Sequence, residues 1–369
     1  MYPFTDKDLP SCQDVKDFWQ EIKQDSRPII VYGIGNGADK LSEYLSLYGR
    51  EISDFFASDG FCRGQMFRGK RVLSFAEVKE KYKDFVILLA FGSSRREVLD
   101  AVYSLSSSYD VRVPEFPLSE KELFDAAFYR AHYDDIMKAY ALLEDDMSRS
   151  LFVSLILHRL TAKLLYLRNA VCYEDESSLL ELEHIKTAVD VGAYRGDTLE
   201  KWRKEAPALT EVYAIEPDRK SFEKLSKNAP CMPFAVHLYH AAAWRADGEG
   251  VFFQSGNRNA SLQKAEETAS FQKKTDLVKT LKIDTILEGR SVELIKYDTE
   301  GAEKEAIEGT SRTIRACKPH LLVSAYHKSR DIFSLLLLLE EAYPGVYRYY
   351  FRRIECLPGW ELNLLAIRK

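Results

Sequence analysis

The chain has 369 residues, which is enough for two domains with their own hydrophobic cores. Hydrophobic residues make up 46% and charged residues 30% of it, as in ordinary soluble proteins. The formal net charge of −5 gives no general reason to expect nucleic acid or an anionic membrane as a partner, and the six cysteines, which form no CxxC pair, argue against a metal cluster or a disulfide framework.

The N-terminal residues 1–8 lack the basic region and the apolar run of a signal peptide. The strongly apolar stretch 333–339 is too short to span a bilayer, and charged residues bracket it. We therefore expect a cytoplasmic protein without a transmembrane segment.

The first 118 residues alternate between short apolar runs and amphipathic stretches. A helix is expected at 15–24, and strands are expected at 28–32, 52–57 and 86–91. The first strand ends in a turn with glycines at 33, 35 and 37, and a helix follows it. Strands that alternate with helices predict a parallel, Rossmann-like sheet over roughly residues 1–115.

The turn from Gly33 to Gly37 departs from the dinucleotide fingerprint GxGxxG, because Ala38 stands at the position of the third glycine. The looser form of the fingerprint accepts alanine at this position. Asp54 and Asp59 lie at about the distance expected for a ribose-binding acid, so binding of NAD stays open. With the stretch 69–78, the arrangement also resembles the small N-terminal domains of sugar-modifying enzymes. That resemblance implies binding of a nucleotide-sugar or a similar phosphate-bearing group; a structural or dimerising domain is the alternative.

Residues 119–169 have helical periodicity and predict a connector between two sheet domains. His132, His158 and the pair 134–135 fall in it without a partner at ligand spacing, so we interpret them as solvated or structural and expect no metal site. The predicted organisation is an N-terminal domain (1–118), a helical connector (119–169) and a C-terminal domain (170–369).

The C-terminal domain begins with a buried strand at 188–191, followed by Gly192 and Gly196 in a turn and a helix near residue 197. Such a turn allows a ligand close to the backbone, and the helix start offers unpaired N–H groups. The next strand, 211–215, ends in Glu216 and Pro217. A carboxylate there can accept both vicinal hydroxyl protons of a ribose, each charge-assisted bond being worth roughly 1.5–3 kcal/mol.

Further strands are expected at 234–240, 292–297 and 320–328, with a hairpin through Gly248 and Gly250 to 251–253 and a polar loop over 255–262. A short element is expected at 282–287 and a helix at 331–342. An antiparallel pair, 346–353 with 361–368, is expected to close the sheet. The acids Asp298, Glu300 and Glu303 then lie at the carboxyl edge of a parallel sheet, where ligands bind in open α/β folds.

Together these motifs resemble the FkbM family of methyltransferases. The matching pieces are 189–198, 215–217, 241–244, Ser261 in its polar loop, 283–287, 295–303, and 326–328 with Asp331. The resemblance covers about residues 170–369 and implies the class I fold of S-adenosylmethionine-dependent methyltransferases, a parallel sheet with a closing antiparallel hairpin. The cofactor-binding residues that it implies are Asp190, Gly192, Ala193, Gly196, Thr198, Glu216, Pro217 and Asp298.

Methyl transfer to oxygen needs an acceptor held in line with the methyl group and a base for the hydroxyl proton. We expect His327 to be this base, with Asp298 as the second candidate; a structural histidine is the alternative. The candidates for acceptor binding are Ser261, Glu300, Tyr326 and Lys328, and the cations Arg258, Arg352 and Arg353 either hold an anionic acceptor or are surface charges.

The sequence thus predicts an S-adenosylmethionine-dependent O-methyltransferase that acts on a carbohydrate or a related hydroxylated metabolite. The acceptor is expected to be a small molecule, a glycan or a nucleotide-sugar, with no nucleic acid as partner; homo-oligomerisation stays open. An NAD-dependent sugar oxidoreductase that uses Gly33 to Gly37, and a non-catalytic binding or scaffold protein, are the two alternative functions.

Overall fold

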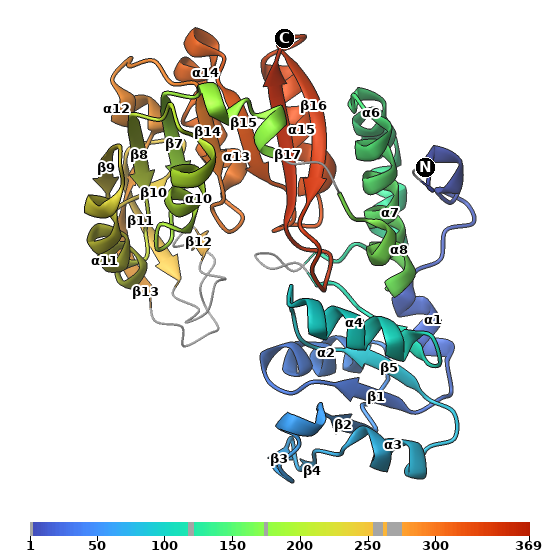
Figure 1. The fold of residues 1–369 in the computed structure, drawn as a ribbon. Helices are drawn as coiled ribbons and strands as arrows, with labels where there is room; N and C mark the ends of the chain where they lie inside the picture. Colours follow the sequence, from blue (N-terminus) through green and yellow to red (C-terminus); the bar gives the residue numbers. More distant parts are fainter. Residues whose placement is uncertain (1–2, 117–121, 173–175, 254–260, 264–274) are drawn as a thin grey trace.

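The computed structural model describes residues 3–116, 122–172, 176–253, 261–263 and 275–369. Two sheets with parallel strands lie at opposite ends of the molecule, and helices between them run beside the last two strands of the chain (Figure 1). The architecture is therefore the expected mixed α/β arrangement. The predicted domain boundaries near residues 118 and 169 stay predictions.

The N-terminal sheet has four parallel strands in the order β2-β1-β5-β6, which confirms the parallel sheet predicted for this region. Alternate residues of β1 pack into different cores, Ile29 and Val31 on one face and Ile30 and Tyr32 on the other, because successive strand side chains point to opposite faces. The strands are β1 (Ile29–Tyr32), β2 (Asp54–Phe56), β5 (Val86–Leu89) and β6 (Asp110–Arg112); the helices are α1 (Phe18–Gln24), α2 (Asn36–Leu47), α3 (Phe75–Lys81) and α4 (Arg96–Ser106). A small separate ribbon pairs β3 (Met66–Phe67) with β4 (Lys70–Arg71).

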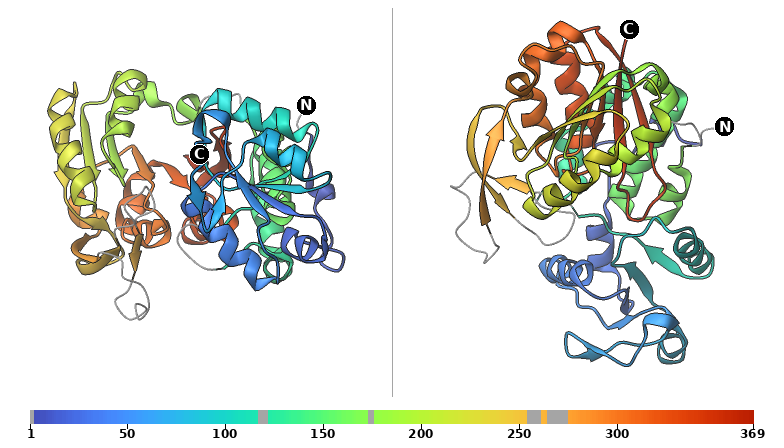
Figure 2. Two further views of the ribbon diagram at one scale, coloured as in Figure 1. Left: turned by 90° about the horizontal axis from the view of Figure 1, so that it is seen from below. Right: turned by 60° about the vertical axis from the view of Figure 1, so that its left-hand side comes forward.

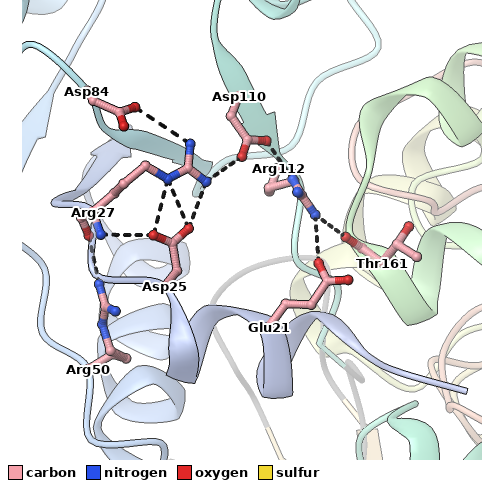
Figure 3. Close-up of polar contacts among 8 residues, drawn as sticks. All are labelled: Glu21, Asp25, Arg27, Arg50, Asp84, Asp110, Arg112 and Thr161. Atoms are coloured by element: carbon pink, nitrogen blue, oxygen red, sulfur yellow. Dashed lines mark hydrogen bonds and ion pairs between the residues drawn. The ribbon is translucent and has the colours of Figure 1, made fainter.

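A network of ion pairs and hydrogen bonds links β6 of this sheet to the segment before β1 and to the end of α7 (Figure 3). Arg27 contacts Asp25 and Asp110, with 2.7 and 2.8 Å between the charged atoms. Arg112 contacts Asp110 at 2.6 Å and donates to the carbonyl of Thr161, at the end of α7, at 2.9 Å. Hydrogen bonds from Arg27 lower the pKa of Asp25, so this carboxyl stays ionised at neutral pH.

The connecting helices are α5 (Ala126–Ala131), α6 (Tyr133–Leu142), α7 (Asp146–Thr161) and α8 (Leu164–Asn169). Of these, α6, α7 and α8 lie beside β16 and β17 and above the N-terminal sheet in the view of Figure 1. Helix α7 is buried along most of its length and contacts the C-terminal strand β16, where Phe351 donates its amide to Ser148 Oγ at 2.9 Å. Neighbouring elements therefore enclose α7, including several of its polar side chains.

The C-terminal sheet has seven strands in the order β16-β17-β15-β14-β7-β8-β9. The five strands from β15 to β9 are parallel, and β17 and β16 close the sheet as an antiparallel pair, as predicted. The strands are β7 (Thr187–Val191), β8 (Glu211–Ile215), β9 (Ala235–Tyr239), β14 (Leu294–Tyr297), β15 (His320–Ser324), β16 (Tyr347–Arg353) and β17 (Leu362–Arg368). The strand order reverses between β7 and β14, and ligands bind at such a switch point in open α/β folds.

Helices surround this sheet on both sides (Figure 2). They are α9 (Glu176–Leu179), α10 (Asp197–Glu205), α11 (Arg219–Asn228), α12 (Ile283–Leu287), α13 (Glu303–Glu308), α14 (Ser311–Cys317) and α15 (Asp331–Ala342). Within the described ranges, none of the helices has the length and apolar character that crossing a membrane requires.

The region between β9 and β14 differs from the prediction. Strands β10 (Ala242–Ala243), β11 (Gly248–Phe253), β12 (Ser261–Gln263) and β13 (Thr275–Leu281) form a separate sheet in the order β10-β13-β11-β12. The predicted hairpin between 241–244 and 251–253 is wrong, because β13 lies between β10 and β11. Ser261 begins a strand rather than lying in a loop; β12 is an edge strand held by backbone pairing with β11, which does not require apolar side chains. Residues 254–260, which include Arg258, lie outside the described residues.

Candidate active site

A cavity of about 920 Å³ lies where the carboxyl ends of both parallel sheets face one another. The residues after β7, β8 and β14 form one wall, and the residues after β1 and β5 form the other. The loop between β16 and β17 extends from the larger sheet toward the N-terminal sheet (Figures 1 and 2). Leu357 in this loop exchanges two backbone hydrogen bonds of 2.9 Å with Ser93. The cavity is therefore assembled from parts of the chain that lie far apart in sequence.

Gly192 forms the floor of this cavity, directly after β7. Its φ of +86° is in the left-handed region, and a Cβ placed on it would lie 1.9 Å from the carbonyl oxygen of Asp298. The amide of Asp298 donates to the carbonyl of Val191 at 2.9 Å, so the loops after β7 and β14 touch through their backbones. Only glycine allows this approach.

Glu216 lies at the end of the neighbouring strand β8 and is 6% exposed. Its Oε2 accepts a hydrogen bond from the amide of Tyr194 and its Oε1 one from the amide of Asp218, both at 2.7 Å. These bonds fix the carboxyl group at the cavity wall. Burial outweighs the two amide bonds and raises the pKa of Glu216 to about 8.

Lys296 connects two of the predicted carboxylates. It points from β14 into the cavity, with its Nζ 3.4 Å from Asp190 Oδ1 and 3.5 Å from Asp298 Oδ2. Burial lowers the pKa of Lys296, but the two carboxylates outweigh burial, so the net effect is a pKa above the ordinary value. Asp190 is fully buried behind this lysine; burial raises its pKa to about 6, and its Oδ2 has no hydrogen-bond partner in the described part of the chain.

His327 is held below the cavity by three carboxylates. Its Nδ1 lies 2.9 Å from Glu303 Oε1, and its Nε2 lies 3.5 Å from Glu300 Oε2 and 3.7 Å from Asp298 Oδ1. The ring is fully buried, whereas Asp298 and Glu300 line the cavity. Burial alone would lower the pKa of His327, but the carboxylates, Glu303 foremost, raise it to about 10. An imidazolium at this depth donates hydrogen bonds and cannot take a proton from an acceptor hydroxyl.

Glu300 lies between His327 and the cavity. Its backbone has a φ of +55°, which is uncommon for a residue other than glycine and is found more often at functional sites. Burial, with smaller effects from Asp298 and Glu303, outweighs the attraction of His327 and raises the pKa of Glu300 to about 8. Glu303 turns away from the cavity and accepts the amide of Thr299 at 2.8 Å, so it braces the loop.

The other predicted site residues divide into two groups. Pro217 and Tyr326 line the cavity, whereas Ala193 and Thr198 are buried in the turn and the first turn of α10. Gly196, with a φ of +92°, is the N-cap of α10 and packs near Leu225. The Lys328 amide donates to Asp331 at 2.8 Å, and the side chain of Ser261 lies outside the described residues.

Arg352 and Arg353 are structural rather than available to an acceptor, because they are 1% and 3% exposed. Arg352 pairs with Asp145 at 2.8 Å. Arg353 donates to the carbonyls of Ala170 and Trp360 at 2.9 and 3.1 Å. Arg353 thus holds the loop between β16 and β17 in place, and Arg352 links β16 to the start of α7.

The N-terminal wall contains the second glycine turn. A Cβ on Gly37 would lie 2.1 Å from the carbonyl oxygen of Ala90, so α2 packs tightly on β5 there, whereas Gly35, with a φ of +110°, has open space around it. Asp54 lies at the opposite edge of the sheet, at the start of β2, where it accepts hydrogen bonds from Lys81 and Tyr82 at 2.7 and 2.6 Å. It cannot serve as the ribose acid considered above. The side chain of Asp59, the other candidate, lies outside the description.

The comparison with family models matches residues 190–347 to the methyltransferase FkbM domain. We call the matched residues 190–347 the FkbM domain. This range begins within β7, includes β8 to β15, and contains all of the acidic residues described after β8 and β14. A comparison with curated proteins gave no match.

Among solved structures, the chain is similar to the methyltransferase FkbM from Methylobacillus flagellatus KT, with a TM-score of 0.67 and 20% identity over 97% of this chain and 94% of that one. The fold is thus shared over nearly the whole length, beyond the FkbM domain itself. A putative rRNA-methylase from Clostridium thermocellum matches with a TM-score of 0.34 and 10% identity, over 54% of this chain and 98% of that one. Fibrillarin from Aeropyrum pernix, in complex with S-adenosyl-L-methionine, matches with a TM-score of 0.32 and 7% identity, over 50% of this chain and 68% of that one.

Two features of the site were not predicted from the sequence. Lys296 is visible as a lysine inside an apolar strand, two residues before Asp298 and therefore on the same strand face, and this was the signal that could have identified it. Trp360 lines the cavity from a loop that showed no motif. No group of three or more histidines, cysteines or acids within the described residues is arranged to hold a metal ion.

Proposed function

We propose that the protein is an S-adenosylmethionine-dependent O-methyltransferase that acts on a hydroxyl group of a carbohydrate or a related hydroxylated metabolite. One observation carries the proposal. Gly192, Glu216 and Asp298 meet at the carboxyl edge of the FkbM domain, around a cavity of about 920 Å³.

The residues of this edge fit the parts of the methyl donor. The carboxylate of Glu216, which two backbone amides already orient, accepts hydrogen bonds from the ribose hydroxyl groups. Gly192 lets the donor approach the backbone, and Asp298 with Lys296 faces the charged amino-acid part. When bound, the donor supplies an electrophilic methyl group on a positively charged sulfur.

The acceptor side needs a group that can take a proton. Glu300 and Asp298 line the cavity, and a pKa of about 8 places Glu300 close to working pH, where a general base is most effective. We therefore assign the base to Glu300, with Asp298 beside it. His327, the base favoured by the sequence, takes a positioning role because it holds both carboxylates from below.

Ligand binding and methyl transfer test the proposal. In titration calorimetry we expect S-adenosylmethionine and S-adenosylhomocysteine to bind and NAD not to bind. Labelled methyl groups should then be transferred from the donor to members of a panel of sugars, glycans and nucleotide-sugars. Binding of NAD alone would favour the oxidoreductase, and binding of none of the three ligands would leave a scaffold protein.

A further inference from the structure

The two walls of the cavity differ in charge. The wall from the FkbM side carries acidic side chains, with Arg195, Lys220 and Lys296 as its bases. Its acids are Asp197, Glu216, Asp218, Asp298, Glu300 and, on the loop before β17, Glu361. On the N-terminal wall, Lys40 is the charged side chain among the described lining residues, and the others are neutral. An acidic wall suits a cationic methyl donor, whereas the described lining residues of the opposite wall include one cation, Lys40, and no acid.

The cavity is large for a small-molecule site. Its volume of about 920 Å³ is near the top of the roughly 300–1,000 Å³ that single small-molecule sites occupy. The part away from the FkbM domain is lined by the aromatic rings of Phe91, Phe116 and Trp360. The indole Nε1 of Trp360 is buried and has no hydrogen-bond partner within the described ranges.

The polar residues of the N-terminal wall converge on one place. Asn36 and Lys40 are four residues apart on α2 and therefore share a helix face, and both line the cavity. Gly35, just before them, leaves open space where a side chain would otherwise project. The amides of the first helical turn have no acceptor within the helix. A lysine with free backbone amides beside an open glycine is the combination that binds phosphate groups in proteins.

We propose, building on the function proposed above, that the methyl acceptor is a phosphate ester whose charged group binds to Lys40 and the start of α2. Its remaining part then lies along Phe91 and Trp360, and its hydroxyl group reaches Glu300 on the opposite wall. The N-terminal sheet is thus the acceptor-binding half of the enzyme. Asp54, one of the two acids considered for ribose binding, faces the other edge of the sheet and does not line this wall.

Titration calorimetry on the full chain tests this inference, with uridine diphosphate, pyrophosphate and uridine as probes. We expect both phosphate compounds to bind in the submillimolar range and uridine to bind at least tenfold more weakly. Lys40→Ala should weaken binding of uridine diphosphate roughly tenfold or more, because it removes a charge-assisted hydrogen bond. Lys40→Arg should retain most of the affinity. Affinity for S-adenosylhomocysteine should change less than about twofold in both variants.

Lys23→Ala is the matched control, since it removes the same charge from α1, outside the cavity. An equal loss in this variant, or equal binding of uridine and uridine diphosphate, would overturn the inference. So would the failure of both phosphate compounds at millimolar concentration while S-adenosylhomocysteine binds, an outcome that leaves the methyltransferase intact. Binding of pyrophosphate as tightly as uridine diphosphate supports a simple phosphate ester, and tighter binding of uridine diphosphate supports a nucleotide-linked one. Phosphate binding without any binding of S-adenosylhomocysteine would instead contradict the proposed function.

Discussion

The two glycine turns of this chain face the same cavity but differ in what surrounds them. The turn at Gly192 lies against the Asp298 carbonyl and among buried acids, whereas the turn at Gly35 is open and has Lys40 as its charged neighbour. Both follow the first strand of a parallel sheet, so the backbone motif is the same. The comparison teaches that a strand-turn-helix unit provides a place for a ligand, while the side chains at the neighbouring strand ends decide which ligand it is.

The largest expected effect is on stability, because the turn at Gly192 is tightly packed and the turn at Gly35 is open. Gly192→Ala should lower the free energy of unfolding by about 4 kcal/mol, since the new Cβ would collide with backbone and the φ of +86° is unfavourable for alanine. Gly35→Ala should cost about 1–2 kcal/mol, because only the backbone strain applies. Urea denaturation of both variants measures the difference, and equal losses would break the comparison.

The next effect concerns His327, which has no counterpart at the N-terminal turn. His327→Gln leaves the buried Glu303 without its cation and should lower the free energy of unfolding at neutral pH by about 3 kcal/mol or more. The pKa of His327 is raised from 6.5 to about 10, so its stabilisation is complete below about pH 6.5 and is lost as pH rises through 10. Urea denaturation between these pH values should therefore show the gap between wild type and variant closing.

His237→Gln is the control for this variant, because His237 is exposed and its pair with Glu211 is a surface ion pair worth about 0–1 kcal/mol. A His327→Gln protein that is as stable as wild type but has lost its turnover would restore the general-base role predicted from the sequence.

A smaller effect tests the acidic character of the Gly192 turn directly. Glu216→Gln should weaken binding of S-adenosylhomocysteine roughly 10- to 100-fold, as expected when a charge-assisted hydrogen bond to the ribose is replaced. Glu211→Gln changes the same residue type at the start of the same strand, at the opposite edge of the sheet, and should leave the affinity unchanged. Calorimetry that finds equal affinities for Glu216→Gln and wild type would remove Glu216 from the donor site.

Most of the fold could be predicted because its signals are local. The apolar runs of β1, β7, β8 and β14 alternate with amphipathic helices, and parallel strands bring their carboxyl ends to one edge. The sequence therefore predicts that Glu216 and Asp298 lie near Gly192. The β10–β13 sheet could not be predicted, because β13 pairs with two strands that come earlier in the chain and its pairing is not encoded in its own composition.

The site was predicted less completely than the fold. The sequence predicts that His327 faces the acceptor, because this residue follows β15. A sequence pattern does not show how deeply a side chain is buried, however, and the imidazole ring lies beneath Asp298 and Glu300. The role of Lys296 depends on two carboxylates from different strands. The shared cavity depends on how two sheets are oriented, which is set by α7 and by the loop of Trp360 rather than by either glycine turn.

The smallest expected effect is a pH dependence of donor binding that only the Gly192 turn should show. The pKa of Glu216 is raised to about 8 by burial, so in the free protein this carboxyl is mainly protonated at pH 6.5 and becomes ionised above 8. Ribose hydroxyl groups bind better to the ionised form. Affinity for S-adenosylhomocysteine should therefore rise roughly tenfold from about pH 6.5 to about pH 8.5. Glu216→Gln, which does not titrate, should lose this slope in calorimetry; an unchanged slope would assign it to another group.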